Sequence, residues 1–389
     1  METEMGYRGS KSEFQNPQPK EIFVKEQRVD GSYFGLNPKL RCTLTGFERN
    51  YLIKIPSKQL NKKFYSTLNY KPKLNPWFIT GFTDAEGCFS ISVKTDSKLK
   101  LKWRVSPLFI IKLHSKDTAI LEAIKNTLGV GKIRQNGINS AQYIVETFID
   151  LKVIVDHFDK YPLITVKLSD YLIFKACFNI IKQKEHLTEK GLFKIVSLKS
   201  SLNWGLSDKL IKAFPNIVTP IRRAGEYKPE YTFKCIPDPF WVAGFTSGDG
   251  SFFLRIKART MKKGLRVSLV YSINLNIREK KVIIGLANFF NFNVTKVSNK
   301  STGLVTTKVQ YKYIYICKDK ISFQITKMSD IINTIIPFFE KYPIVGIKSL
   351  DFADFKKVCD MVKNKEHLTP EGSKKILQIK SRMNQNRAY

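Results

Sequence analysis

The sequence reads WFITGFTDAEG at residues 77–87 and FWVAGFTSGDG at residues 240–250. Each copy is an apolar pattern of helical period that carries small residues and ends in an acid followed by glycine. Gly81 and Ala85 are four residues apart, as are Gly244 and Gly248, so each pair lies on one helix face. A glycine inside a helix costs about 1 kcal/mol relative to alanine. The repeated cost predicts that the two helices pack closely against each other.

The acids at the ends of the two copies are Glu86 and Asp249. If the helices pack side by side, these carboxylates meet at the helix C-termini, where the helix dipole disfavours negative charge. Two of them together favour a bound cation. The glycine that follows each acid fits either a left-handed C-cap or a tight turn into a strand.

Length and charge restrict the class of protein. A chain of 389 residues is long enough for two domains with real cores. The chain has 66 Lys and Arg residues but only 33 Asp and Glu, which gives a net charge of +33. This charge indicates a polyanionic partner, most simply nucleic acid. No apolar run is long enough to span a bilayer, so a membrane partner is not expected. The six scattered cysteines indicate free thiols rather than disulfides or a zinc site.

A second repeat shows that the whole chain is duplicated. FDKYPLITVK at residues 158–167 returns as FEKYPIVGIK at residues 339–348. Each half is predicted to run helix, two strands, helix, two strands, then helices, like a dimer fused into one chain. The predicted organisation is an N-terminal extension (1–70), a first half (71–203), a proline-rich linker (204–238) and a second half (239–389). The extension is polar, with one or two short strands expected within residues 39–57.

Strict alternation of apolar and polar residues predicts the strands at 88–94, 100–106, 251–257 and 266–273. Further strands are expected at 131–136, 142–148, 294–298 and 308–316, and helices at 116–128 and 280–290. The polar face is largely basic or hydrogen-bonding, with few acids. A sheet face that is only exposed to solvent would show the same alternation of apolar and polar residues. The excess of basic residues over acids on this face favours a DNA-binding surface instead. The predicted DNA-binding residues are Ser90, Ser92, Lys94, Lys100, Lys102, Arg104, Arg134 and Gln142, and then Arg255, Lys257, Arg259, Arg266, Ser268, Lys296, Lys308, Gln310 and Lys312.

The two motif copies, with their matching downstream strands, resemble the LAGLIDADG motif of homing endonucleases. The resemblance covers roughly residues 71–389. It implies an α+β fold made of two pseudo-symmetric αββαββα-type halves. Each half would carry a saddle-shaped antiparallel sheet, and the halves would join at a two-helix interface.

The resemblance also implies site residues. Glu86 and Asp249 match the motif acids that hold the divalent metal, Mg²⁺ or Mn²⁺, with two or more ions expected. Lys167 and Lys348 match a basic residue near the scissile phosphate. Asp84 is matched by Ser247 in the second copy, which argues against a required ligand there. Where the family often has a polar, water-positioning side chain, this chain has Leu113 and Leu275, with Lys112 and Asn274 adjacent.

The resemblance implies a monomeric, metal-dependent endonuclease that cuts a long, non-palindromic site in double-stranded DNA and leaves short 3′ overhangs. The gene would lie in a fungal mitochondrial intron, with residues 1–70 either a fusion to a host reading frame or a disordered tail. A signal peptide is not expected, because the start carries acids and lacks an apolar core segment. Two alternatives remain open: an RNA maturase that assists splicing of its own intron, and a sequence-specific repressor.

Overall fold

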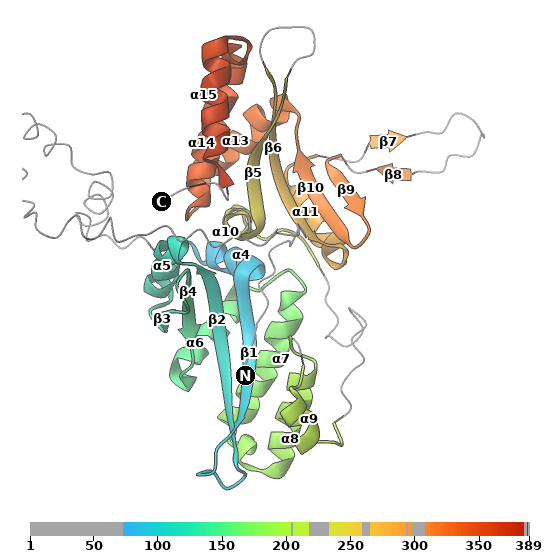
Figure 1. Cartoon of the computed structure of the whole chain (residues 1–389). Helices are drawn as coiled ribbons and strands as arrows, with labels where there is room; N and C mark the ends of the chain where they lie inside the picture. The colour runs from blue at the N-terminus through green and yellow to red at the C-terminus, as the bar shows by residue number, and fades with distance from the viewer. Residues whose placement is uncertain are drawn as a thin grey trace, which may run out of the picture. The chain divides into compact units, whose positions relative to one another are not determined.

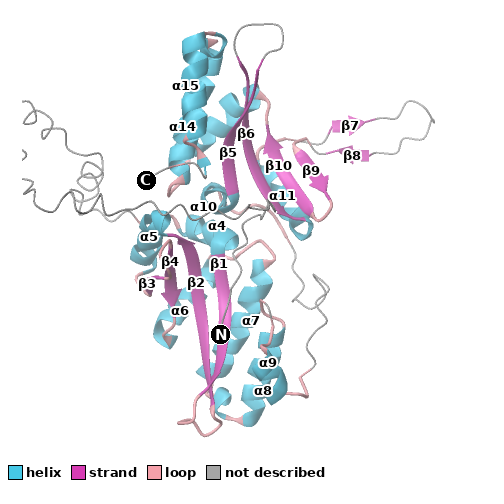
Figure 2. Ribbon diagram, in the orientation of Figure 1, coloured by secondary structure: helices cyan, strands magenta, loops and turns pink. Residues whose placement is uncertain are grey.

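The computed structural model of the chain describes residues 73–203, 205–217, 233–258, 265–292, 295–297, 308–310, 312–384 and 387 (Figures 1 and 2). The extension 1–70 with its predicted strand segment 39–57, residues 218–232 of the predicted linker, and Arg259 lie outside these ranges. Within the described ranges, no helix combines the length and hydropathy that a membrane crossing requires.

Two halves with the same plan make up residues 73–384. The first half contains α4 (Pro76–Glu86), β1 (Gly87–Thr95), β2 (Trp103–His114), η2 (Ser115–Asp117), α5 (Thr118–Leu128), β3 (Lys132–Gln135), β4 (Ser140–Val145), α6 (Phe148–Lys160), α7 (Lys167–Lys182), η3 (Glu185–Leu187), α8 (Glu189–Ser200) and α9 (Asp208–Ala213). The second half contains α10 (Pro239–Asp249), β5 (Gly250–Ala258), β6 (Leu265–Asn276), η4 (Ile277–Glu279), α11 (Lys280–Phe289), β7 (Thr295–Val297), β8 (Lys308–Gln310), β9 (Ile314–Cys317), β10 (Lys320–Ile325), α12 (Met328–Asp330), η5 (Ile331–Ile335), α13 (Ile336–Lys341), α14 (Lys348–Lys363), η6 (Glu366–Leu368) and α15 (Pro370–Ser381).

Each half contains a four-stranded antiparallel sheet, with strand order β1-β2-β4-β3 in the first and β5-β6-β10-β9 in the second. Helices cover one face of each sheet, and the two motif helices α4 and α10 lie side by side between the halves (Figure 1). The predicted α+β fold with two pseudo-symmetric halves and a two-helix interface is therefore confirmed.

Both motif helices begin with the same start signal. The side chain of Asn75 accepts a hydrogen bond from the backbone N–H of Trp77 at 2.8 Å, and Asp238 accepts from Phe240 at 2.7 Å. Each cap is followed by a proline, which suits the first helical turn because its missing N–H would be unpaired there anyway. The local sequence thus sets where both helices start.

The helices end without a left-handed cap. Gly87 has φ −71° and ψ 153°, and Gly250 has φ −76° and ψ 159°, so both are extended and open the next strand directly. The tight turn was the correct alternative, and the left-handed cap was wrong. Glycine is needed here for space, because a Cβ on Gly87 would lie 2.4 Å from Cγ2 of Thr83.

The predicted alternation in β1 and β5 is confirmed. Phe89, Ile91 and Val93 are buried on one face of β1, while Ser90, Ser92 and Lys94 lie on the other. In the second half Phe252 and Leu254 are buried, and Arg255 and Lys257 are exposed. The apolar faces pack against helices α6 and α7 in the first half and α13 and α14 in the second.

Several predicted strand limits were wrong. Lys100 and Lys102 lie in the turn between β1 and β2, where Lys102 has a left-handed φ of 57°, and β2 starts only at Trp103. Strand β4 ends at Val145, because Thr147 caps α6 by accepting the backbone N–H of Asp150.

The second half departs further from the prediction. Within the described residues, the expected strand 294–298 forms β7 and the start of the expected strand 308–316 forms β8, and these two pair with each other in a separate two-stranded sheet. The end of the second expected strand falls in β9. The four-stranded sheet is completed by β9 and by β10, a strand that was not predicted. Its alternation was visible in the sequence, since Ile321, Phe323 and Ile325 are all buried.

Part of the predicted linker packs onto the first half. Leu210 in α9 is buried, together with Ile217, in a cluster that includes the outer ends of β1 and β2. The ring of Phe214 lies 5.4 Å from that of Trp103. Residues 205–217 therefore cover the first half's core rather than only connecting the halves.

Candidate active site

The motif helices approach each other through their glycines. A Cβ on Gly81 would lie 2.1 Å from the carbonyl oxygen of Trp241, and a Cβ on Gly244 would lie 2.1 Å from that of Phe78. One turn further on, a Cβ on Gly248 would lie 2.3 Å from Cβ of Ala85. The prediction that these small residues form a close helix–helix contact is confirmed.

This contact brings the two motif acids to neighbouring helix ends. The side chain of Glu86 lies against the second motif helix: a Cβ on Gly248 would lie 3.1 Å from the Cγ atom of Glu86. Burial, and secondly the charge of Glu86, raise the pKa of Asp249 to about 7. Burial also raises the pKa of Glu86, against the opposing effect of Lys167 and Lys348. A partly buried carboxylate whose ionisation is disfavoured by a second carboxylate beside it is suited to sharing a cation with that neighbour.

Lys167 and Lys348 occupy equivalent places beside these acids. The ammonium of Lys167 donates to the carbonyl oxygens of Thr83 at 3.0 Å and Ala85 at 3.1 Å. Lys348 donates to those of Thr246, at 3.3 Å, and Gly248. Each lysine thus holds the C-terminal carbonyls of its own half's motif helix, where the dipole favours positive charge. Burial lowers the pKa of Lys348, and the charges of Glu86 and Asp249 oppose this.

The donor set fits a hard divalent cation that keeps much of its water shell. Among the residues that the structure describes, no group of three or more His, Cys, Asp or Glu side chains is arranged to hold a metal. Glu86 and Asp249 offer two carboxylates, and Mg²⁺ is commonly held by one or two carboxylates, with waters and phosphate oxygens as the other ligands.

Asp84 has a different role from the motif acids, although it lies two residues before Glu86. Its buried carboxylate accepts hydrogen bonds from Trp241 Nε1 at 2.8 Å, from Thr165 Oγ1 at 2.6 Å, and from the backbone amides of Ile164 and Thr165. At the equivalent position Ser247 accepts from the backbone amide of Val345 at 3.2 Å. Asp84 therefore joins the motif helix to the segment before α7, and to the other half through the indole.

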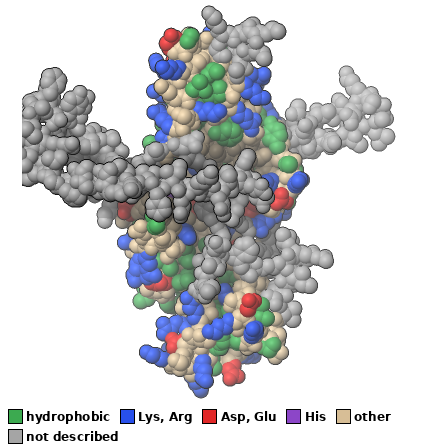
Figure 3. Space-filling view, in the orientation of Figure 1, with side chains coloured by type: hydrophobic (Ala, Val, Ile, Leu, Met, Phe, Trp, Pro, Cys, Tyr) green, Lys and Arg blue, Asp and Glu red, His purple; other side chains and the backbone are tan. Residues whose placement is uncertain are grey.

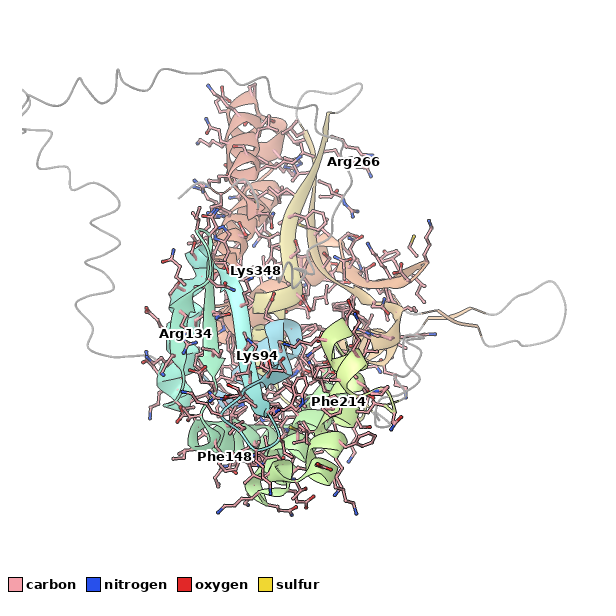
Figure 4. All side chains as sticks on the ribbon, turned by 60° about the horizontal axis from the view of Figure 1, so that its bottom comes forward. Lys94, Arg134, Phe148, Phe214, Arg266 and Lys348 are labelled. Carbon is pink, nitrogen blue, oxygen red and sulfur yellow. The ribbon has the colours of Figure 1, made fainter. Side chains whose placement is uncertain are left out.

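The first half's sheet gathers most of its predicted binding residues on one face. Lys94 lies opposite Arg104, and Gln142 lies between Arg134 and Lys112 on neighbouring strands. Arg134 is ion-paired with Glu146 at 2.5 Å, and Arg104 with Asp96 at 2.6 Å. Lys100 and Lys102 lie in the β1–β2 turn beyond the strands, so they do not share this face as predicted. Figure 4 labels Lys94 and Arg134 in this half.

In the second half, Lys257 lies opposite Arg266 and Arg255 opposite Ser268. Arg255 also donates to Gln324 Oε1 of β10 at 3.1 Å. The register therefore places a basic pair at the outer end of both sheets, Lys94 with Arg104 and Lys257 with Arg266. In Figure 4 Arg266 lies at the outer end of β6, while Lys348 lies near the motif helices. Lys and Arg side chains are spread over the visible face of both halves (Figure 3).

Four predicted binding residues are not on this sheet. Lys296 lies on β7, and Lys308 and Gln310 on β8, so they belong to the separate two-stranded sheet; their side chains lie outside the described part of the chain. Lys312 precedes β9 and pairs with Asp330 at 2.8 Å. Its ammonium also lies over the ring of Tyr313, 4.7 Å from the ring centre. The predicted placement on the sheet failed because it continued one strand across residues 308–316, whereas residues 312 and 313 form a turn between β8 and β9.

The sequence prediction missed several polar residues on the same faces. They are Lys112 and Lys132 in the first half, and Asn274, Ser322 and Gln324 in the second. Lys112 and Asn274 are equivalent and exposed, whereas the neighbouring Leu113 and Leu275 pack against the cores. The alternation within β2 and β6 carried this signal.

Comparison with known proteins agrees with this geometry. The LAGLIDADG endonuclease family matches residues 79–178 and 242–359. A probable intron-encoded endonuclease 3 from Neurospora crassa is 35% identical over 396 residues, which cover 96% of this chain and 69% of the relative.

Solved structures show the same fold. The LAGLIDADG meganuclease I-CpaMI, bound to uncleaved DNA, is 44% identical with a TM-score of 0.70, covering 80% of this chain and 100% of that one. I-SmaMI, bound to an uncleaved DNA target in the presence of calcium ions, is 40% identical with a TM-score of 0.70, covering 80% and 99%. Because the family matches more than half of the chain, in two regions that each carry a motif helix and its sheet, the protein belongs to the LAGLIDADG endonuclease family.

Proposed function

We propose that this protein is a site-specific endonuclease that hydrolyses both strands of double-stranded DNA with divalent cations held between Glu86 and Asp249. The observation that carries the proposal is the meeting of these two carboxylates, one from each half, at the ends of helices packed too closely for a Cβ at Gly81 or Gly244. The DNA-bound state of the related meganucleases supports the choice of substrate.

The basic sheet faces would bind the DNA on both sides of the cut. A pair of antiparallel strands fits into the major groove of DNA. There Arg, Lys, Gln and Asn side chains distinguish the base pairs by the hydrogen-bond donors and acceptors on the base edges. Other basic side chains contact phosphates and add affinity without sequence information. The two faces carry different side chains, Ser90 being matched by Phe253 and Lys112 by Asn274. One chain would therefore act as a monomer on a long, non-palindromic site.

When bound, divalent cations neutralise phosphate charge, lower the pKa of an attacking water and stabilise the leaving oxygen. We propose Mg²⁺ or Mn²⁺, with two or more ions. Lys167 and Lys348 would each place a positive charge beside the phosphate. A lysine ammonium has three N–H donors. Two are used on the helix carbonyls, so one is left for a water or a phosphate oxygen.

The relatives support a proposal for the biological setting. The Neurospora crassa relative is described as intron-encoded. We infer that this chain is likewise encoded in a fungal mitochondrial intron and acts in that organelle on DNA that lacks the intron.

The test is cleavage of a randomised DNA library by the full chain with Mg²⁺, followed by sequencing of the products. Cleavage at one long motif is expected, and Glu86→Gln should abolish cleavage with Mg²⁺ while DNA binding survives in a gel-shift assay. Asp156→Asn is the control, because Asp156 is exposed on α6, where it forms an ion pair with the exposed Lys152. An intact library under every divalent cation tried would refute the proposal.

The main alternative is an RNA maturase on the same fold, since a basic sheet face also binds RNA. Loss of a motif acid would favour it, but both acids are present. In a splicing assay with the host intron, a maturase should be unaffected by Glu86→Gln, and the wild-type protein should leave DNA intact.

A further inference from the structure

Two acids outside the motif form equivalent contacts across the two halves. Asp117 ends η2, which follows β2, and Glu279 ends η4, which follows β6. Glu279 of the second half accepts the backbone amide of Val166 in the first half, at 3.2 Å to Oε1 and 3.3 Å to Oε2. Asp117 of the first half accepts the backbone amide of Ile347 in the second half at 2.8 Å. Each half therefore contributes an acid to the other.

The amides that these acids bind lie directly before the two active-site lysines. Val166 is the N-cap of α7 and Ile347 the N-cap of α14, and the first residues of these helices are Lys167 and Lys348. Each acid accepts the N–H of the N-cap residue itself. In a capping box this N–H is bound by a Glu or Gln of the same helix, whereas here the acid comes from the other half. The first amides of a helix lack internal partners and favour negative charge, which makes the contact stabilising.

The fit around these acids is close. Gly346 has a left-handed φ of 85°, and a Cβ there would lie 2.7 Å from Oδ1 of Asp117. Glu279 is 8% exposed, and burial raises its pKa to about 7. The charge of Asp117 acts on both Lys348 and Glu86, and that of Lys167 acts on Glu279. The two contacts therefore belong to the same electrostatic cluster as the carboxylates.

We propose that Glu279 and Asp117 are positioning residues, each of which fixes the catalytic lysine of the opposite half by holding the amide that precedes it. This inference rests on the proposed nuclease function. The inference adds that neither half fixes its own lysine alone. The position of Lys167 or Lys348 depends on an acid contributed by the other half. Neither acid is required to touch DNA or metal.

The pseudo-twofold arrangement gives the inference a strand-specific consequence. The two phosphates to be cut lie on opposite strands and are related by the axis that relates Lys167 to Lys348, so each lysine serves one strand. Loss of Glu279 should misplace Lys167 and slow the cut on the strand that Lys167 serves. Loss of Asp117 should slow the other cut. A misplacement of about 1 Å can cost around 100-fold in rate.

The experiment uses the full chain and measures nicking and linearisation of a supercoiled plasmid that carries the selected site. Cutting of each strand is measured separately on a linear duplex of that site whose two strands are labelled at their ends. Glu279→Ala should accumulate nicked DNA, with one strand cut at least about tenfold more slowly, as expected for a displaced catalytic group. The slow strand should be the one that Lys167→Ala also slows. Asp117→Ala should slow the opposite strand, shared with Lys348→Ala. Glu279→Gln and Asp117→Asn keep an amide-accepting oxygen and should restore most of the lost rate.

The pairing of strands separates positioning from general damage. If Glu279 only stabilises its own half, Glu279→Ala will slow the strand served by Lys348, and the inference is wrong. It is equally wrong if both strands slow together, or if neither does. Should Glu279→Ala fail to fold, Asp117→Ala, compared with Asp117→Asn and Lys348→Ala, tests the same inference in the other half. The control is Glu185→Ala, an acid in the 3₁₀ helix η3 that pairs with Lys194. If the wild-type protein cuts no DNA, the proposed function fails first.

Discussion

Gly244 lies directly against the backbone of Phe78: a Cβ at Gly244 would come within 2.1 Å of the Phe78 carbonyl oxygen. Gly81 has the same relation to Trp241 on the other helix. Because both obstacles are backbone atoms inside paired helices, no side-chain rotation can relieve the contact. The two helices must move apart before either glycine can be replaced.

Gly244→Ala should therefore destabilise the protein by about 3 kcal/mol or more, the upper part of the range for overpacked sites. Separation of the helices would also move Glu86 away from Asp249, so cleavage should fall further than stability alone explains. Urea unfolding and a cleavage assay at a temperature where the variant is folded would measure both effects. Ser197→Ala, an exposed change in α8, should alter unfolding by less than about 0.5 kcal/mol.

The two halves differ in how they satisfy a buried threonine. Thr246 shares a hydrogen bond with the hydroxyl of Tyr271 at 2.8 Å. Its counterpart Thr83 has a buried hydroxyl with no hydrogen-bond partner among the residues that the structure describes, because Phe109 stands at the place of Tyr271. Tyr271→Phe should cost about 1 kcal/mol of unfolding free energy, and Phe109→Tyr should add up to about 1 kcal/mol.

Chemical denaturation of the single variants and of Thr83→Ala with Phe109→Tyr would check this second prediction. The gain from Phe109→Tyr should vanish once Thr83 is removed. A gain that persists in the double variant would mean that the new hydroxyl binds elsewhere.

His157 should make stability depend on pH. Its Nε2 lies 3.2 Å from Thr80 Oγ1, which itself donates to the carbonyl oxygen of Tyr161, so the imidazole N–H donates to Thr80. Burial lowers the pKa of His157 to about 4. The unfolded chain then binds this proton more readily than the folded one, and stability is lost as pH falls from about 6.5 towards 4.

The loss due to His157 should reach about 2 kcal/mol between pH 7.5 and pH 5, as expected for a pKa difference of this size. His157→Asn, which keeps an N–H donor, should lose less stability over the same interval. The measurement is the urea midpoint of both proteins at the two pH values. Equal losses in wild type and variant would contradict the assigned direction.

The basic pairs at the outer ends of the sheets should contribute mainly through phosphate. Lys257→Ala should weaken binding to every DNA sequence and reduce the slope of log affinity against log salt by about 1. Gel shifts at three salt concentrations would show this. Lys152→Ala changes a lysine on α6, which covers the opposite face of its sheet, and should leave the slope unchanged.

Local patterns in the sequence were sufficient for the motif helices and for the presence of the first two strands of each half, although not for where the second strand begins. Lys167 and Lys348 were predicted from the resemblance to the family, and the four residues proposed for catalysis remain a prediction. Small residues spaced four apart indicate one face of a helix, and alternating apolar and polar residues indicate the two faces of a strand. Each of these patterns can be recognised within about ten consecutive residues. The roles of Asp117 and Glu279 carry no such signal, because each acts on a backbone amide of the other half. Lys312 was wrongly placed on the sheet face for a related reason: it lies in a turn before β9, where it pairs with Asp330, and alternation does not reveal that turn.

Because Glu279 and Asp117 each bind a backbone amide of the opposite half, halves taken from different nucleases of this family should not combine freely. A chimera that keeps residues 73–217 but takes its other half from a different enzyme inherits α7 without Glu279. Its two halves would still assemble through the motif helices, which contact each other at their glycines, but Lys167 would lack the acid that fixes its position. Grafting a compatible acid at the end of the incoming 3₁₀ helix should therefore improve such hybrids more than redesigning their DNA-facing strands.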